Sequence, residues 1–307
     1  MRASSRAQRC LLMAVGVIFT LAVGGTSQAG AASALVVTTN TTLNAEYAGQ
    51  IVVVGTDVTL DCAGHRVAGA GELVGINIVA SGVTVTNCQV QGFEVGIQTS
   101  ADATRVLGNI VTDNDQGIRL AGESNGTVSG NRANRNRSWG IIAAQAATGA
   151  TISDNSASSN GLIGIALNTV SGILVTGNSA NHNGGTGVDS LWSSYNQIRD
   201  NVAVDNGTTG FEFGSASNNT VSGNVANNNG MPGNGTGFSF NNSSGNTVSD
   251  NIAVHNGGVG FFAFFGSELN LFTLNRACAN FYVDAADIST GAANSWTDNE
   301  FCTGEVV

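Results

Sequence analysis

Apolar and polar positions alternate in short stretches along most of the chain, and the alternation returns about every 23 residues. At one fixed place in each unit stands an asparagine, and successive members of this column are 22 to 27 residues apart. The residue three positions earlier is apolar and mostly β-preferring. A fixed period of about 20–50 residues indicates a repeat architecture. The column comprises Asn87, Asn109, Asn131, Asn155, Asn178, Asn201, Asn224, Asn251, Asn275 and Asn299.

Two further features of the unit predict its local structure. A second asparagine follows the first after five residues in most units, and a glycine followed by an apolar residue comes next. Asparagine and glycine tolerate the left-handed backbone of tight turns, and the alternating apolar residues between them favour short strands. Beyond the N-terminus, no segment has the apolar period of an amphipathic helix. The second column comprises Asn114, Asn136, Asn160, Asn183, Asn206, Asn229, Asn256 and Asn280.

Short strands at a fixed period predict an all-β fold, a single-stranded parallel β-helix of about eleven coils with a repeat of 22–24 residues. Coils stack about 4.8 Å apart, so each inward residue lies over its counterpart in the preceding coil. Inward phenylalanines fill the interior, and inward asparagines satisfy the backbone groups of the bends by amide-to-amide hydrogen bonds. A third column, five residues before the first, marks another bend: Asn196, Asn219, Asn246, Asn270 and Asn294.

The residue pattern of the repeat resembles that of a known family. The segment Asn219–Ala226 reads Asn-x-Val-Ser-Gly-Asn-x-Ala, and Leu60-Asp61-Cys62-x-Gly64-His65 opens the repeats. Together with Val83-Thr84-Val85-x-Asn87-Cys88, these residues resemble bacterial right-handed β-helix repeat proteins of the pectin-lyase-like group, which includes the NosD-like periplasmic proteins. The resemblance covers residues 35–303 and implies a right-handed helix. It implies no single function, since the group includes lyases, hydrolases, epimerases and adhesins.

Residues 1–34 have the pattern of a secretory signal peptide with a short linker, which leaves residues 35–307 as the β-helix domain. Three arginines precede the apolar run from Leu11 to Val23, and small residues follow it, with cleavage expected between about Ala29 and Ala34. The run is short for a membrane span. A membrane-anchoring helix is the alternative. The sequence therefore predicts a secreted, extracytoplasmic protein without stable membrane insertion.

Four cysteines remain once residues 1–34 are set aside. Cys62 and Cys88 are 26 residues apart, and Cys278 and Cys302 are 24 residues apart, which is about one coil in each case. One-coil spacing brings the two backbones within disulfide range. We therefore expect one disulfide at each end of the solenoid. Cys62 and Cys88 are offset by one position within the repeat unit, so their disulfide requires a bulge in the chain. A metal or redox site is the alternative, but no Cys-x-x-Cys motif supports it.

The charge balance restricts the partners. The chain has no lysine, and without residues 1–34 eight arginines face 21 acidic residues, a net charge of −13. Such a surface lacks the basic stripe that binds nucleic acid, and it would repel polyuronates unless calcium bridged them. The abundant Asn, Ser, Thr and Gly instead offer a polar hydrogen-bonding surface. This composition favours a neutral polysaccharide or cell-envelope glycan as partner.

No complete catalytic or metal-binding motif is present. Asp113 and Asp115 flank one turn and could pose as the carboxylate pair of a glycosidase, but solvated turn residues are the simpler interpretation. Asp154, Asp200 and Asp250 share one column, yet they fall on alternate coils, too far apart to hold one calcium ion. The sequence therefore predicts no metal site, and a calcium cofactor has no supporting ligand cluster.

One polar column offers candidate catalytic residues. His182 and Asp205 lie at equivalent places in successive coils, about 5 Å apart, and His255 lies two coils beyond Asp205. A His–Asp pair can orient an imidazole for acid–base chemistry or help to hold a metal ion. The column also adjoins turn glycines, where exposed polar residues are expected without any function.

Candidate substrate-binding residues are the tryptophans and one inserted loop. Trp139 lies at a turn, and Trp192 follows a strand two coils later. Aromatic side chains on a β-helix wall can stack on sugar rings. The unit that contains Met231 and Asn234 is four residues longer than its neighbours, and a projecting loop of this kind often borders a groove.

These observations leave three functional hypotheses. The first is a secreted, noncatalytic solenoid that presents a polar wall to glycans or to the cell envelope. The second is a polysaccharide lyase, hydrolase or epimerase with a divergent site. The third is a NosD-like accessory role in periplasmic metal assembly, although the chain has only three His and three Met to handle a soft metal.

Overall fold

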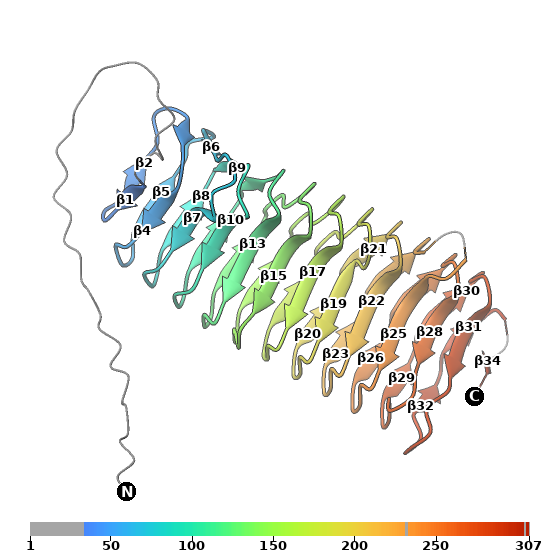
Figure 1. Ribbon diagram of the computed structural model, residues 1–307. Coiled ribbons are helices and arrows are strands. Elements are labelled where there is room, and N and C mark those ends of the chain that lie inside the picture. The colour runs from blue at the N-terminus through green and yellow to red at the C-terminus, as the bar shows by residue number, and fades with distance from the viewer. Residues whose placement is uncertain (1–33, 231–232, 304, 307) are drawn as a thin grey trace, which may run out of the picture. The chain divides into compact units, whose positions relative to one another are not determined.

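The chain winds into a right-handed parallel β-helix of about eleven turns (Figure 1). The computed structural model describes residues 34–230, 233–303 and 305–306, and within these ranges it contains strands and turns but no helix. Every described strand pairs in parallel with the equivalent strand of a neighbouring coil. The predicted all-β solenoid is therefore confirmed. The predicted signal peptide lies outside the described residues, apart from Ala34.

Three parallel sheets form the faces of the coil. Sheet A comprises β1 (Leu35–Val37), β4 (Ile51–Val53), β7 (Val74–Ile78), β10 (Val95–Thr99), β13 (Gln116–Ala121), β15 (Trp139–Ala144), β17 (Ile163–Asn168), β19 (Val188–Leu191), β22 (Thr209–Gly214), β25 (Thr236–Asn241), β28 (Val259–Ala263), β31 (Val283–Asp287) and β34 (Glu305–Val306). Sheet B comprises β2 (Thr41–Thr42), β5 (Thr59–Asp61), β8 (Thr84–Thr86), β11 (Arg105–Leu107), β14 (Thr127–Ser129), β16 (Thr151–Ser153), β18 (Leu174–Thr176), β20 (Gln197–Arg199), β23 (Thr220–Ser222), β26 (Thr247–Ser249), β29 (Leu271–Thr273) and β32 (Ser295–Thr297).

Sheet C forms the third face in two parts. Isolated bridges through Arg132, Ser156 and Ser179 connect the two parts across the middle coils. The first part comprises β3 (Tyr47–Ala48), β6 (Arg66–Ala68), β9 (Gln89–Gln91) and β12 (Ile110–Val111), and the second comprises β21 (Val202–Val204), β24 (Val225–Asn227), β27 (Ile252–Val254), β30 (Arg276–Cys278) and β33 (Glu300–Phe301).

Stacked columns of equivalent residues fill the interior. The rings of Phe211, Phe238 and Phe261 are fully buried and stack with centroids 4.8 Å apart, which is the spacing of neighbouring strands. Phe213 and Phe240 form a second stack, with centroids 4.7 Å apart. The predicted inward aromatic column is confirmed. Because each ring lies on its counterpart, the core is built by repetition of one side-chain position.

The asparagine columns are inward ladders. The Oδ1 of Asn201 accepts hydrogen bonds from both the backbone N–H and the Nδ2 of Asn178, at 3.0 and 2.9 Å. Its own Nδ2 donates to the backbone carbonyl of Val175 in the preceding coil and to Oδ1 of Asn224 in the next coil. The same pattern recurs at the second asparagine column and, from Asn196 onward, at the third. Each buried amide thus satisfies the backbone groups that a bend leaves unpaired.

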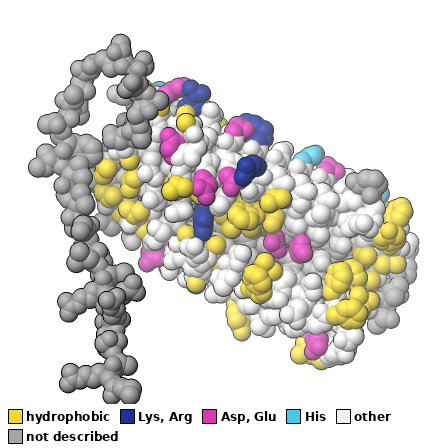
Figure 2. All heavy atoms as spheres, viewed as in Figure 1, with side chains coloured by type: hydrophobic (Ala, Val, Ile, Leu, Met, Phe, Trp, Pro, Cys, Tyr) yellow, Lys and Arg dark blue, Asp and Glu magenta, His cyan; other side chains and the backbone are white. Residues whose placement is uncertain are grey.

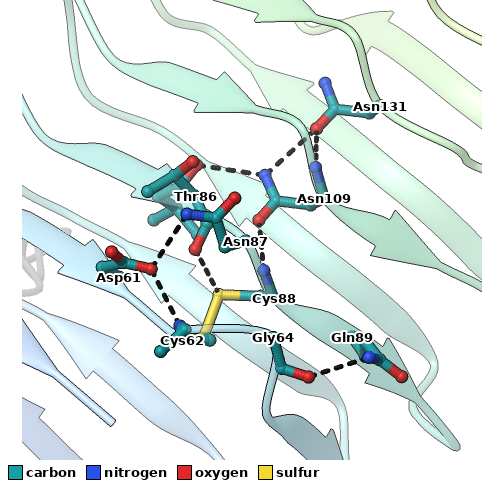
Figure 3. Close-up of a disulfide and its surroundings, with 11 residues drawn as sticks. Asp61, Cys62, Gly64, Thr86, Asn87, Cys88, Gln89, Asn109 and Asn131 are labelled. Carbon is teal, nitrogen blue, oxygen red and sulfur yellow. Dashed lines mark hydrogen bonds between the residues drawn. A yellow bond between two sulfur atoms is a disulfide. The ribbon is translucent and has the colours of Figure 1, made fainter.

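Asn87 is the exception, and its assignment to the ladder is wrong. Its side chain is exposed, and its φ of 54° places it at the left-handed position that Gly108 occupies one coil later. Cys88 takes the ladder position instead, because its backbone N–H donates to Oδ1 of Asn109 at 2.9 Å (Figure 3). Asparagine is one of the few residues other than glycine that adopt a left-handed backbone, so Asn87 can take the turn position that a glycine takes in the next coil.

Disulfides join the cysteines as the coil spacing predicts. Cys62 is bonded to Cys88, with Cα atoms 4.7 Å apart, and Cys278 is bonded to Cys302, with Cα atoms 5.0 Å apart. In the first pair Cys62 directly follows β5, whereas Cys88 is separated from β8 by Asn87 (Figure 3). This offset is the expected bulge.

In the part of the chain that the structure describes, no helix has the length and apolarity that crossing a bilayer requires.

Candidate functional site on the outward face of sheet A

The predicted His–Asp column exists as an exposed ion pair. His182 Nε2 lies 3.3 Å from Asp205 Oδ2, and both side chains are at the surface. His255 stands two coils beyond Asp205 in the same column, too far to join the pair. All three residues have a left-handed backbone, with φ of 54–57°, so they occupy a tight turn at the corner between sheets C and A. Among the described residues, no third side chain forms a hydrogen bond or ion pair with either member of the pair.

The same corner carries, in earlier coils, charges that are already paired. Arg135 lies 3.2 Å from Asp113, and Arg137 lies 2.9 Å from Asp115, across a surface hollow of about 610 Å³. Asp115 also accepts a hydrogen bond from the Ser138 hydroxyl at 2.8 Å. Because arginine partners engage both aspartates, they do not form the free carboxylate pair that a glycosidase requires.

The structure separates the two tryptophans and describes only part of the loop. Trp139 begins β15 and is half-buried against the outward face of sheet A, whereas Trp192 follows β19 at the corner between sheets A and B and is 60% exposed. The two therefore lie on opposite edges of sheet A, two coils apart. Asn234 is exposed on its loop, and Met231 lies outside the described residues.

The outward face of sheet A carries a column of side chains that alternates with the inward core. In each strand the inward aliphatic or aromatic residue is followed by one that points out, because successive side chains of a strand alternate faces. Register pairing stacks these outward residues coil upon coil: Asn77, Gln98, Arg119, Ile142, Ala166, Asp189, Glu212, Ser239 and Phe262. The character of the column changes from polar to apolar to acidic along this order.

An apolar platform occupies the middle of this face. Ile142, Ala144 and Ala166 form a small cluster outside the core, and Trp139 and Ile163 pack against it. Figure 2 shows hydrophobic side chains gathered near the middle of the face on view, with acidic side chains beside them. Ile142, Ala144 and Ala166 are only 7%, 8% and 5% exposed, so the half-buried side chains of Trp139 and Ile163 supply most of the apolar surface of the platform.

A hollow of about 560 Å³ borders the platform on its arginine side. Gln116 is only 8% exposed and lines the hollow, yet its Oε1 has no hydrogen-bond partner among the described residues. The Nε of Arg119 is likewise buried and unpaired, and no carboxylate of the described chain pairs with this arginine. Buried polar groups normally have partners, so the hollow holds an unmet acceptor and an unmet donor.

A carboxyl pair borders the platform on the other side. Asp189 on β19 and Glu212 on β22 are register partners on neighbouring strands. Glu212 Oε2 accepts a hydrogen bond from the Thr186 hydroxyl at 3.1 Å. Burial raises the pKa of Asp189 to about 7, and the negative charge of Glu212 adds to the rise. Asp189 can therefore hold a proton near neutral pH, which an ordinary aspartate does not.

Sequence reasoning missed Gln116, Arg119, Asp189 and Glu212. The repeat itself contains the signal that could have found the last three, because the outward residue stands two positions after the recurrent glycine. At most coils this place holds an uncharged residue, and only at three does it hold a charge: Arg119, Asp189 and Glu212. Gln116 has no such signal, since its missing partner is visible only in three dimensions.

The described residues do not fit a metal centre. No group of three or more His, Cys, Asp or Glu comes together in the part of the chain that the structure describes. His65, His182 and His255 lie in different coils, and all four described cysteines are in disulfides. Copper bound by protein needs imidazole or sulfur ligands grouped around it. The histidines and cysteines described here supply no such group.

Family models match two overlapping parts of the chain. A right-handed β-helix region matches residues 139–277, and the periplasmic copper-binding protein NosD matches residues 40–190. By its fold, the chain is a right-handed parallel β-helix repeat protein. No curated protein matches this β-helix protein in sequence.

Solved structures share the fold at low sequence identity. The A-module of the mannuronan C-5 epimerase AlgE6 of Azotobacter vinelandii aligns with a TM-score of 0.64 and 16% identity, over 86% of this chain and 79% of that one. The periplasmic alginate epimerase AlgG aligns at 0.59 and 14%, over 82% and 77%. An alginate lyase from Paenibacillus aligns at 0.56 and 14%, over 73% and 89%. At this identity the likeness establishes the β-helix fold.

Proposed function

We propose that this β-helix is an extracytoplasmic protein that binds a neutral, hydroxyl-rich glycan along the outward face of sheet A. The observation that carries the proposal is the contiguous apolar platform around Trp139, with hydrogen-bonding side chains on both sides of it. The signal-like N-terminal sequence and the two disulfides support export, because disulfides persist in oxidising compartments.

The chemistry of this face fits a sugar chain. Sugar rings have apolar faces that pack on tryptophan and aliphatic side chains, and their hydroxyl groups donate hydrogen bonds to carboxylates. Asp189 and Glu212 offer such acceptors, and together with the acidic chain they repel a polyanion. The named activities of the three structural neighbours, on mannuronan or alginate, support a polysaccharide partner in general. The net charge of this chain favours a neutral one.

A glycan array followed by calorimetry on the glycans that bind tests the proposal. Trp139→Ala removes the aromatic part of the platform, and we expect it to weaken binding at least tenfold while the melting temperature changes little. Trp192→Ala is the matched control, because it removes an exposed tryptophan at the opposite edge of sheet A. Loss of binding in the control alone, or no binding to any neutral glycan by the parent, would contradict the proposal.

The carboxyl pair favours a second function, cleavage of the bound glycan. In this reaction protonated Asp189 donates its proton to the glycosidic oxygen as the bond to the anomeric carbon breaks. Register partners on neighbouring strands lie about 5 Å apart, so Glu212 then bonds to that carbon as the nucleophile, and water cleaves the resulting glycosyl ester while Asp189 takes the proton of the water. A carboxyl that holds its proton near neutral pH beside a second carboxyl is the requirement for such chemistry.

Analysis of products after prolonged incubation separates the two functions. Binding without new reducing ends identifies a noncatalytic protein. If new reducing ends form, Asp189→Asn and Glu212→Gln should abolish them and leave affinity within a few-fold of the parent. Continued cleavage by both variants would exclude the carboxyl pair. The third hypothesis, metal assembly, finds no ligand group among the described residues.

A further inference from the structure

We infer that the hollow between β13, β15 and β17 is a subsite for one neutral sugar ring, which stacks on Trp139 and presents hydroxyl groups to Gln116 and Arg119. The inference rests on the proposed glycan function and specifies which chemistry the site selects. The subsite lies on the arginine side of the platform, away from the carboxyl pair.

The unmet groups define the class of ligand. Gln116 Oε1 accepts hydrogen bonds, and the Arg119 Nε–H donates them, and both are buried without partners. A carboxylate or sulfate only accepts, so it would satisfy Arg119 and leave Gln116 Oε1 unpaired. An ammonium group only donates, so it would leave the Arg119 Nε–H unpaired, and its positive charge would be repelled by that of Arg119. A hydroxyl both donates and accepts, and it is the common group that satisfies the two together.

The walls of the hollow suit a ring with one apolar face. Trp139, Ile142 and Ala144 form its apolar side, and Gln145, Asn168 and Thr169 form a polar rim. Its volume of about 560 Å³ lies within the usual range for small-molecule sites. Gln145 and Thr169 on the rim are exposed, so a glycan chain can continue out of the hollow past them.

The direction of that chain follows from the strand register. Asp189 and Glu212 lie three and four coils beyond Arg119 in the same outward column, or about 14 and 19 Å away at the ordinary strand spacing. A glycan that occupies the subsite and crosses the platform therefore reaches the carboxyl pair after a few sugar units. The subsite fixes the register of the glycan, and the carboxyl pair contacts a unit further along it.

Calorimetry with cellohexaose, xylohexaose and mannohexaose as neutral probes and hexagalacturonate as acidic probe tests the subsite. For the neutral probe that binds best, Gln116→Met and Arg119→Met should each lower affinity at least tenfold, since each leaves hydroxyls without a partner. Gln98→Met is the matched control, because Gln98 lies in the same outward column one coil before Arg119 and does not line the hollow. Its affinity should equal that of the parent.

The outcomes separate the subsite from the broader proposal. Unchanged affinity in Gln116→Met and Arg119→Met, with loss in Trp139→Ala, overturns the subsite and leaves the glycan function standing. Tighter binding of hexagalacturonate than of every neutral probe overturns the neutral assignment. Absence of binding to all four probes overturns both. If the variants unfold, monodeoxy forms of the bound probe on the parent protein replace them, and full affinity for every deoxy form overturns the subsite.

Discussion

Asp284 ends the second asparagine ladder by accepting the hydrogen bonds of Asn280. Its Oδ1 lies 2.8 Å from Asn280 Nδ2 and 3.3 Å from the Asn280 backbone nitrogen, and it accepts a hydrogen bond from each. Within the ladder, the Oδ1 of the asparagine in the next coil accepts the same two hydrogen bonds. Its Oδ2 accepts from the backbone N–H and hydroxyl of Thr303. A carboxylate accepts on both oxygens, so it can close a ladder that no further asparagine continues.

Asp284→Ala should therefore loosen the last coils. Buried donors of Asn280 and Thr303 would lose their partners, at about 1–3 kcal/mol for each group left unpaired. Hydrogen exchange should show faster amide exchange in residues 280–303 and no change before β25. Asp250→Asn is the control, since Asp250 is exposed outside the ladder. Equal exchange in Asp284→Ala and the parent would show that the cap contributes nothing.

Acid should weaken the same cap. Burial raises the pKa of Asp284, but the hydrogen bonds from Asn280 and Thr303 outweigh it and hold the pKa below its ordinary value of 3.8. A lowered pKa contributes stability that is present above the ordinary value and is lost as pH falls through the folded-state value. The difference in stability between the parent and Asp284→Ala should hence shrink only below about pH 4.

Glu123 should have the opposite dependence on pH. Burial raises its pKa from 4.5 to about 7, the negative charge of Asp102 adds to the rise, and the Thr104 hydroxyl offsets part of it. The folded chain prefers protonated Glu123, so stability falls as pH rises from about 4.5 to 7. Glu123→Gln should remove that decline, a gain of up to about 3 kcal/mol at pH 8.

Urea unfolding at pH 4, 6 and 8 checks this expectation. Glu94→Gln serves as the control, because Glu94 is exposed and its neutralisation should leave the pH profile of the parent unchanged. A Glu123→Gln variant that loses stability between pH 4 and 8 as steeply as the parent would contradict the assignment.

The ladder in mid-solenoid should tolerate no apolar substitute. Asn201→Leu removes an amide that serves two donors and two acceptors in neighbouring coils, and about 1–3 kcal/mol is expected for each buried group left unpaired. Asn241→Leu makes the same change at an exposed position of β25 and should alter stability by less than about 0.5 kcal/mol. Similar melting temperatures for the two variants would refute an inward ladder that supports the fold.

The two disulfides predict which peptides remain linked after digestion without reductant. Digestion of the exported protein without reductant should link Cys62 to Cys88 and Cys278 to Cys302, with no link between the two ends. Replacing Cys278 and Cys302 by serine should destabilise the protein by about 2–4 kcal/mol, because the open loop gains freedom when it unfolds. A crossed link would overturn the coil register at one end.

The solenoid could be predicted from the sequence, because a residue that must lie over its counterpart in every coil recurs with a period that can be counted. Asn178 and Asn201 could be assigned to the interior from spacing alone, and so could the aromatic stack at Phe211 and the pairing of Cys278 with Cys302. Asn87 could not, since one extra residue before Cys88 shifts the register and spacing does not show which of the two faces inward.

The location of the proposed glycan-binding face depends on the tertiary structure. Gln116 and Trp139 are 23 residues apart and Asp189 and Glu212 also 23, so their contact depends on which strand of the coil they occupy and which way they point. A polar residue with no partner looks the same in the sequence as a satisfied one. The unmet groups of Gln116 and Arg119, and the raised pKa of Asp189, arise from burial, which exists only once the coils are stacked.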